Sequence, residues 1–347
     1  SVAGNTVLGE SALDASVTGG NNTAIGKQAL TALTSGSSNT SVGFDSLAAT
    51  TTGSDNIGIG SKSLFTNSTG SNNVAIGVSA LRNSTGDDNT AIGRSALFAN
   101  TSGTSNVGLG KNVLAANTTA SDNTAVGNAA LTANTTGTRN TAVGSLALDA
   151  TTTANDNAAF GYNALGSNTT GVDNNAFGAN VLDANTTGDR NCAFGFQALT
   201  ANTTADNNTA FGHKTLEANT TGVDNTAVGA FALDANTTGN DCVAVGKQAL
   251  TDNTTGINNT ALGFQSLENN TTANNNTAVG YESMAANTTG ASNTAVGANA
   301  LSTNSTSAHN TAVGKDALKL TTTENNTAVG SAALDACTTG PRNVAVG

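Results

Sequence analysis

The sequence predicts an all-β fold, a parallel β-solenoid (β-roll) of about 20 coils with about 17 residues in each coil. Two observations predict it. Glycine returns at a nearly constant spacing along all 347 residues, and the residues at fixed offsets from it keep their chemical type. The composition agrees, because Thr, Val, Ile, Asn and Gly favour strands and turns. Only 10% of the residues are charged, whereas disordered chains are typically rich in charge.

The repeat can be counted from the last glycine of the pentad N-T-A-V-G. These glycines give 20 intervals between Gly9 and Gly347. Eighteen of them equal the step from Gly9 to Gly26, and two are one position shorter (77 to 93 and 314 to 330). Asn stands four residues before glycine in all units except one, where Cys242 replaces it, and Leu stands four residues after it in all except one, where Met284 replaces it. A repeat of this length is too short for a pair of helices and fits one solenoid coil.

Each unit is expected to contain two short strands and two turns. The first strand is T-A-V before the glycine, and the second is A-L-x-A, as in residues 130–133. The turns are G-x-x and N-T-T-G-x-x-N, the latter as in residues 134–140. Stacked coils would lie about 4.8 Å apart, so that each residue lies above its equivalent in the previous coil.

Stacking turns each recurring position into a ladder. We expect the large apolar residue before glycine and the Leu after it to face each other inside the coil, and the Asn side chains to bond along the axis. The predicted ladder residues are Asn22, Asn73, Asn123, Asn225, Asn293, Val126, Phe160, Phe177, Phe194, Phe211, Leu131, Leu199 and Leu250.

The position between Thr and Val is almost always alanine, as at Ala125, Ala142, Ala227 and Ala295. Strand residues alternate between faces, so alanine would point outward if valine points inward. An outward position restricted to small residues suggests a contact with another chain, most simply in a trimer. The alternative is a single-chain coil whose interior is crowded at this position.

At Asn73–Gly77 (N-V-A-I-G) and the related N-T-A-V-G pentads, the sequence resembles the head repeats of YadA-type trimeric autotransporter adhesins. The N-T-T-G-x-x-N-T-A-V-G spelling is also similar to repeats of phage tail-fibre proteins. The resemblance implies a left-handed parallel β-roll in which three chains associate. This chain departs from the adhesin pattern in its second turn, which N-T-T-G lengthens by about three residues.

Several functions are disfavoured by composition and spacing. The net charge of −11 argues against nucleic acid, and no apolar stretch reaches the roughly 20 residues that cross a bilayer. His213 and His309 lie about six coils apart, and the three cysteines lack metal-site spacing. We therefore expect no catalytic, cofactor or metal site, and no enzymatic activity. The N-x-T sequons, such as Asn117 and Asn134, are read as turns, with glycosylation as the alternative.

The predicted function is a structural or adhesive extracellular fibre segment, on a cell surface or a virion. Residues 1–347 form one continuous repeat array without separate domains, expected to be part of a longer fibre. Its predicted partner is itself, as a homotrimer or an end-to-end filament, with a cell-surface or glycan receptor at a tip outside this sequence. The alternative is an ice-binding or other flat-surface-binding solenoid with Thr and Asn ladders.

Overall fold

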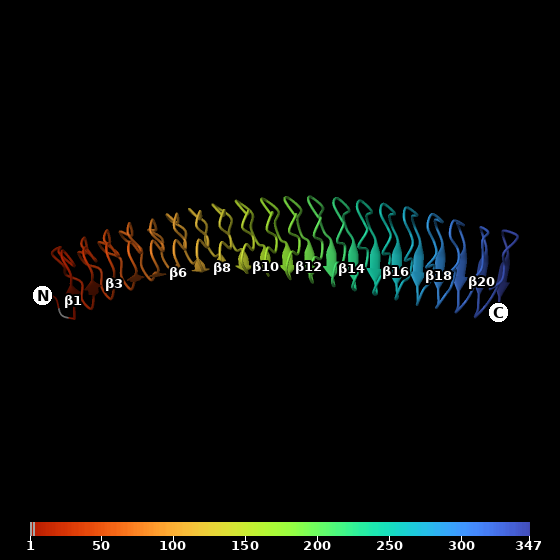
Figure 1. Ribbon diagram of the computed structural model, residues 1–347, viewed down its shortest axis with the longest axis horizontal. Coiled ribbons are helices and arrows are strands. Elements are labelled where there is room, and N and C mark those ends of the chain that lie inside the picture. Colours follow the sequence, from red (N-terminus) through yellow and green to blue (C-terminus); the bar gives the residue numbers. More distant parts are fainter. Residues whose placement is uncertain (1, 3) are drawn as a thin grey trace. The chain divides into compact units, whose positions relative to one another are not determined.

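The structure is a computed structural model that describes Val2 and residues 4–347. Over these residues every regular element is a β-strand of three residues, and the strands stack one per coil (Figure 1). The predicted all-β parallel solenoid is therefore confirmed. The chain divides into two compact units, residues 1–174 and 175–347, which are described separately below.

The strands follow the glycine period in both units. Unit 1 contains β1 (Thr6–Leu8), β2 (Thr23–Ile25), β3 (Thr40–Val42), β4 (Ile57–Ile59), β5 (Val74–Ile76), β6 (Thr90–Ile92), β7 (Val107–Leu109), β8 (Thr124–Val126), β9 (Thr141–Val143) and β10 (Ala158–Phe160). Unit 2 contains β11 (Asn175–Phe177), β12 (Cys192–Phe194), β13 (Thr209–Phe211), β14 (Thr226–Val228), β15 (Val243–Val245), β16 (Thr260–Leu262), β17 (Thr277–Val279), β18 (Thr294–Val296), β19 (Thr311–Val313), β20 (Thr327–Val329) and β21 (Val344–Val346).

Within each unit, successive strands pair in parallel with like residues side by side. In β8 and β9, for example, Thr124 pairs with Thr141 and Val126 with Val143. The register is kept across the two shorter repeats, because Val74 pairs with Thr90 and Thr311 with Thr327. In these two coils the missing residue is lost from the second turn, so the strands remain aligned.

The second predicted strand, A-L-x-A, is not formed. In residues 128–133 the backbone makes turns, and both Ala129 and Leu131 have positive φ, at 58° and 50°. A strand needs consecutive extended residues, which the left-handed conformation at alternate positions prevents. The turns still bond between coils, as Leu131 N–H donates to the Ala147 carbonyl at 3.0 Å.

The core of each coil is narrow and filled by small and branched apolar side chains. Leu131, Leu199 and Leu250 are fully buried, as predicted, together with the alanine that precedes each of them. The reference glycines lie at the corner after each strand, with φ of 137° at Gly127. A Cβ there would collide with the backbone of the glycine in the next coil, which explains why this position never varies.

Candidate assembly face

The first and third residues of each strand point away from the core and form one surface, which we call the strand face. In β8, Thr124 and Val126 are partly exposed while Ala125 between them is fully buried. The same pattern recurs in β2, β9 and β17. The strand face therefore consists of two parallel columns of side chains that run along the stack in each unit.

This orientation reverses the predicted one. Val126 was expected inside the coil and Ala125, Ala142, Ala227 and Ala295 outside, yet these four alanines are fully buried in the single chain. The prediction that they contact another chain is therefore wrong.

A crowded interior explains why these positions stay small. Where glycine replaces alanine at Gly108, an added Cβ would lie 3.1 Å from Val113 and 3.3 Å from Leu97. At Gly58 the same atom would lie 3.1 Å from Leu47. The opposing leucine already fills the coil, so the strand turns inward only glycine, alanine or, at Ser41, serine in the coils with a fully buried strand centre.

The strand face carries no charged residue in any of the strands given above. Its first column is mostly Thr or Val, and its second column is Val, Ile, Leu or Phe. Several second-column side chains keep more than a third of their surface exposed, for example 38% at Ile59 and 38% at Val228. In unit 1, about ten coils of about 4.8 Å and strands about 10 Å long give a face of roughly 480 Å².

Aromatic residues occupy the second column over part of unit 2. The rings of Phe177 and Phe194 stack with centroids 4.4 Å apart, and those of Phe194 and Phe211 stack at 4.5 Å. The predicted aromatic run is thus present in unit 2, on the strand face and not in the core. Phe160 has the equivalent position in β10 of unit 1.

The threonines of the strand face differ from those of the second turn. Thr118 Oγ1 donates to the Thr135 carbonyl at 3.0 Å, and Thr135 repeats the bond to Thr152. By contrast, no hydrogen bond is seen for the strand-face hydroxyls within the described chain. Five of these lie in successive coils of unit 2, at Thr260, Thr277, Thr294, Thr311 and Thr327. They are free to bond to water or to another surface.

Beneath the strand face runs the predicted asparagine ladder. The backbone N–H of Asn123 donates to Asn106 Oδ1 at 3.1 Å, and its Nδ2 donates to the Gly137 carbonyl at 2.9 Å. The side chains of this ladder, including Asn22, Asn73, Asn225 and Asn293, are fully buried. At most positions their hydrogen bonds satisfy both the amide groups and the corner backbone, which makes the stack rigid, whereas Asn310 Nδ2 is buried without a partner.

A second buried ladder was not predicted. It consists of the first Asn of N-T-T-G, and Asn134 Nδ2 donates to Asn117 Oδ1 at 2.9 Å and to the Gly137 carbonyl at 3.0 Å. The two ladders therefore converge on the same carbonyl. The recurrence of this Asn was the available signal, but it was interpreted as a turn residue. Its full burial also removes the sequon as a glycan acceptor in the folded chain.

Charged side chains lie on the turns. The clearest ion pair joins Arg139 to Asp156, with Nε–Oδ1 and Nη2–Oδ2 distances of 2.6 and 2.8 Å. The hydrogen bond from Arg139 lowers the pKa of Asp156. Both side chains are well exposed, so the pair stabilises the fold only weakly.

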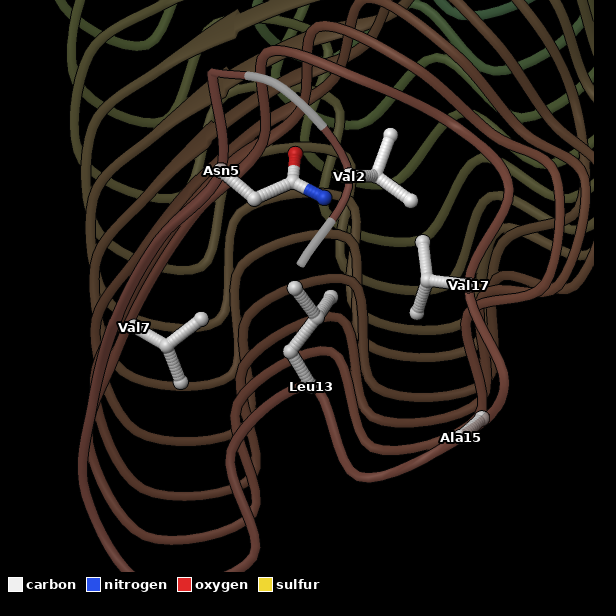
Figure 2. Close-up of a pocket in the computed structure, with 6 residues that line it drawn as sticks. All are labelled: Val2, Asn5, Val7, Leu13, Ala15 and Val17. Carbon is white, nitrogen blue, oxygen red and sulfur yellow. The ribbon is translucent and has the colours of Figure 1, made fainter.

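Within the described residues, no three His, Cys, Asp or Glu side chains are arranged to hold a metal ion. The three cysteines are free thiols, and burial raises the pKa of Cys242 to about 11. No helix among these residues is suited to crossing a membrane. A cavity of about 220 Å³ lies inside the first coil, lined by the uncharged residues Val2, Asn5, Val7, Leu13, Ala15 and Val17 (Figure 2).

Comparison with protein families, curated proteins and solved structures gave no match.

Proposed function

We propose that this chain is a structural segment of an extracellular fibre, and that copies assemble through their strand faces. In this proposal the solenoid acts as a rigid rod or spacer and catalyses no reaction. The observation that carries it is the strand face, an uncharged surface that runs along each unit. Its area of roughly 480 Å² in unit 1 equals that of the largest patch on a typical monomeric protein, and such patches are often functional.

A homotrimer is the assembly that we favour. Around a common axis, the same unit of three chains can turn its strand face inward, and so remove all three of these faces from water. The resemblance of the N-V-A-I-G and N-T-A-V-G pentads to trimeric adhesin heads supports the same stoichiometry. The buried asparagine ladders and fixed register supply the rigidity that a spacer needs.

The proposal is tested by the mass of the full chain in solution. We expect sedimentation equilibrium to give three times the chain mass, and expect the double variant Val126→Lys and Val143→Lys to shift the population toward single chains. Lysine at these positions would place unpaired charges in a dry contact. The control variant, Thr119→Lys and Thr136→Lys, adds the same charge at exposed second-turn positions and should keep the wild-type mass.

A single-chain mass for the wild type at all concentrations, with circular dichroism showing folded β-structure, would refute assembly through the strand face. Equal dissociation of the test and control variants would show that added charge, and not the strand face, decides the mass.

A second candidate function is binding to a regular flat surface such as ice. Its support is the row of five strand-face hydroxyls in unit 2, spaced by the coil rise and flanked by aliphatic side chains. This function competes with assembly, because both use the same face. Thermal hysteresis and ice shaping by the full chain would support it, and their absence in single chains would rule it out.

A further inference from the structure

A second surface is formed by the first turn of each coil. Side chains one, two, five and, at Asp252, six residues after the reference glycine lie there. Lys214 Nζ lies 2.9 Å from Glu217 Oε1, and the His213 and Phe231 rings have centroids 5.2 Å apart. We call this surface the first-turn side. It is distinct from the strand face, which lies before the glycine.

In unit 1 the first-turn side carries a cluster of positive charge. Over residues 60–133 it bears four cations and no carboxylate, because the three acidic residues of this segment, Asp87, Asp88 and Asp122, belong to the second turn. None of the four cations forms an ion pair in the part of the chain that the structure describes. We call them the cationic patch: Lys62, Arg82, Arg94 and Lys111.

Arg82 has the most constrained environment in the cationic patch. Its guanidinium lies between two phenylalanine rings of the neighbouring coils, 5.7 Å from the centroid of Phe65 and 5.7 Å from that of Phe98. The Lys62 ammonium lies 5.8 Å from the Phe65 ring. Arg82 Nε is buried and has no hydrogen-bond partner. The rings hold the guanidinium in place but leave its hydrogen-bonding capacity unused.

In unit 2 the same side is acidic. Over residues 212–285 the first turns carry five carboxylates and two lysines, and only Lys214 is paired there, with Glu217. Asp234 Oδ1 is buried without a hydrogen-bond partner, in the same position of the repeat as Arg82. Burial, and the nearby charges of Glu217 and Asp252, raise the pKa of Asp234 to about 6. We call the carboxylates the acidic patch: Glu217, Asp234, Asp252, Glu268 and Glu282.

We propose that the cationic patch of one chain binds the acidic patch of a second copy, so that rods associate side by side with a stagger. Both patches lie on the same side of the coil, and their charges are complementary. They also have similar lengths, about 14 and 19 Å at the coil rise of about 4.8 Å. Among the described residues, two charged side chains have a buried polar atom without a hydrogen-bond partner. They are Arg82, in the cationic patch, and Asp234, in the acidic patch.

This contact joins two different surfaces, so a chain can bind one copy through its cationic patch and another through its acidic patch, and association can continue from rod to rod. It rests on the proposed fibre function, to which it adds lateral growth. Ionic strength distinguishes the lateral contact from the strand-face assembly, because exposed charges are screened within about 10 Å at 0.1 M salt whereas an apolar contact persists. The mass in 500 mM NaCl reports the strand-face assembly, and any increase in 20 mM NaCl reports the lateral contact.

The test is a charge exchange on the full chain, followed by sedimentation velocity. The cation-reversed variant carries Lys62→Glu, Arg82→Glu, Arg94→Glu and Lys111→Glu. The acid-reversed variant carries Glu217→Lys, Asp234→Lys, Asp252→Lys, Glu268→Lys and Glu282→Lys. We expect each variant alone to lose the low-salt association of the wild type by at least tenfold in affinity, and a mixture of the two to regain it.

A control variant has the same net charge as the acid-reversed one but keeps both patches. It reverses five acids of the second turns, by Asp87→Lys, Asp88→Lys, Asp122→Lys, Asp224→Lys and Asp241→Lys, and should associate as the wild type does. If the cation-reversed variant fails to fold, Arg82 is kept and the other three substitutions are used. Salt-independent association, association of either reversed variant alone, or a mixture that stays dissociated would each overturn the proposal.

Discussion

The buried leucine of each coil adopts a backbone conformation that leucine rarely has. Leu131 is fully buried with φ of 50°, and its equivalents in the other coils have φ between 46° and 56°. Left-handed backbone costs an ordinary residue about 1–2 kcal/mol and is worse for a β-branched one. This explains why the position accepts Leu and, at residue 284, Met, but never Val or Ile.

Replacing Leu131 with Ile should therefore be more harmful than replacing it with Met. We expect Leu131→Ile to lower the free energy of unfolding by about 2 kcal/mol, and Leu131→Met by less than about 1.5 kcal/mol. Urea unfolding followed by circular dichroism measures both. Equal losses in the two variants would mean that side-chain volume, and not backbone conformation, restricts the position.

Asp234 should make stability depend on pH in an unusual direction for a carboxylate. Its pKa rises from the ordinary 3.8 to about 6 in the folded chain, so the folded state binds the proton more tightly than the unfolded state. Its contribution to stability is therefore present below about pH 4 and is lost as the pH rises through 6.

The matched variant is Asp234→Asn, which cannot ionise. Thermal unfolding at pH 4 and pH 8 should show similar melting temperatures for the two proteins at pH 4 and a higher one for the variant at pH 8. The half-exposed side chain is partly screened by solvent, so we expect a difference of about 1 kcal/mol at pH 8. A variant that is less stable than the wild type at pH 8 would contradict this assignment.

At the scale of the element, the sequence predicted the position and register of each T-A-V strand, but it also predicted a second strand that does not form, and it assigned the wrong residues of T-A-V to the core. The glycine period placed T-A-V and the Leu and Asn columns correctly. A three-residue strand turns either its middle residue or its two outer residues inward, and both arrangements satisfy the alternation. The choice depends on the space left by the opposing leucine, which only the folded coil defines, so the strand face was predicted on the wrong residues.

The second asparagine ladder contains a defect that can be repaired. Thr151 replaces Asn in this ladder, and Asn134 Oδ1 of the preceding coil is buried without a partner. We expect Thr151→Asn to donate to Asn134 Oδ1 and to the Ala154 carbonyl, as Asn134 does to Asn117 and Gly137. A buried hydrogen bond contributes about 1 kcal/mol, and chemical denaturation should detect a gain of that order. Unchanged or reduced stability would show that the second ladder does not add to stability.

At the scale of the whole molecule, stability within a unit should depend on complete coils. Deletion of residues 128–144 removes one complete repeat and brings identical positions together, so the new junction repeats a native pairing. Deletion of residues 128–135 removes about half a coil and would place the strand of one coil against the turn of another. We expect the first variant to melt within a few degrees of the wild type and the second to unfold at much lower temperature. Similar melting curves for the two deletions would contradict the one-unit-per-coil fold.

The proposed assembly and partner contacts do not follow from the repeat alone. The repeat determines which residues of neighbouring coils stack on each other, whereas interfaces depend on the positions at which the residue type varies between repeats. Such positions are occupied by Lys62, Arg82 and Asp234. That they all lie on the first-turn side becomes apparent only once the first turn is folded.

The two shortened coils show which part of the repeat tolerates a change in length. Each omits a residue from its second turn, yet the strands on either side pair as they do elsewhere. The hydrogen-bonded stack thus tolerates a second turn that is one residue shorter. A foreign peptide inserted at residue 87 or at residue 324 would accordingly be displayed from a second turn while the strands on either side stay paired.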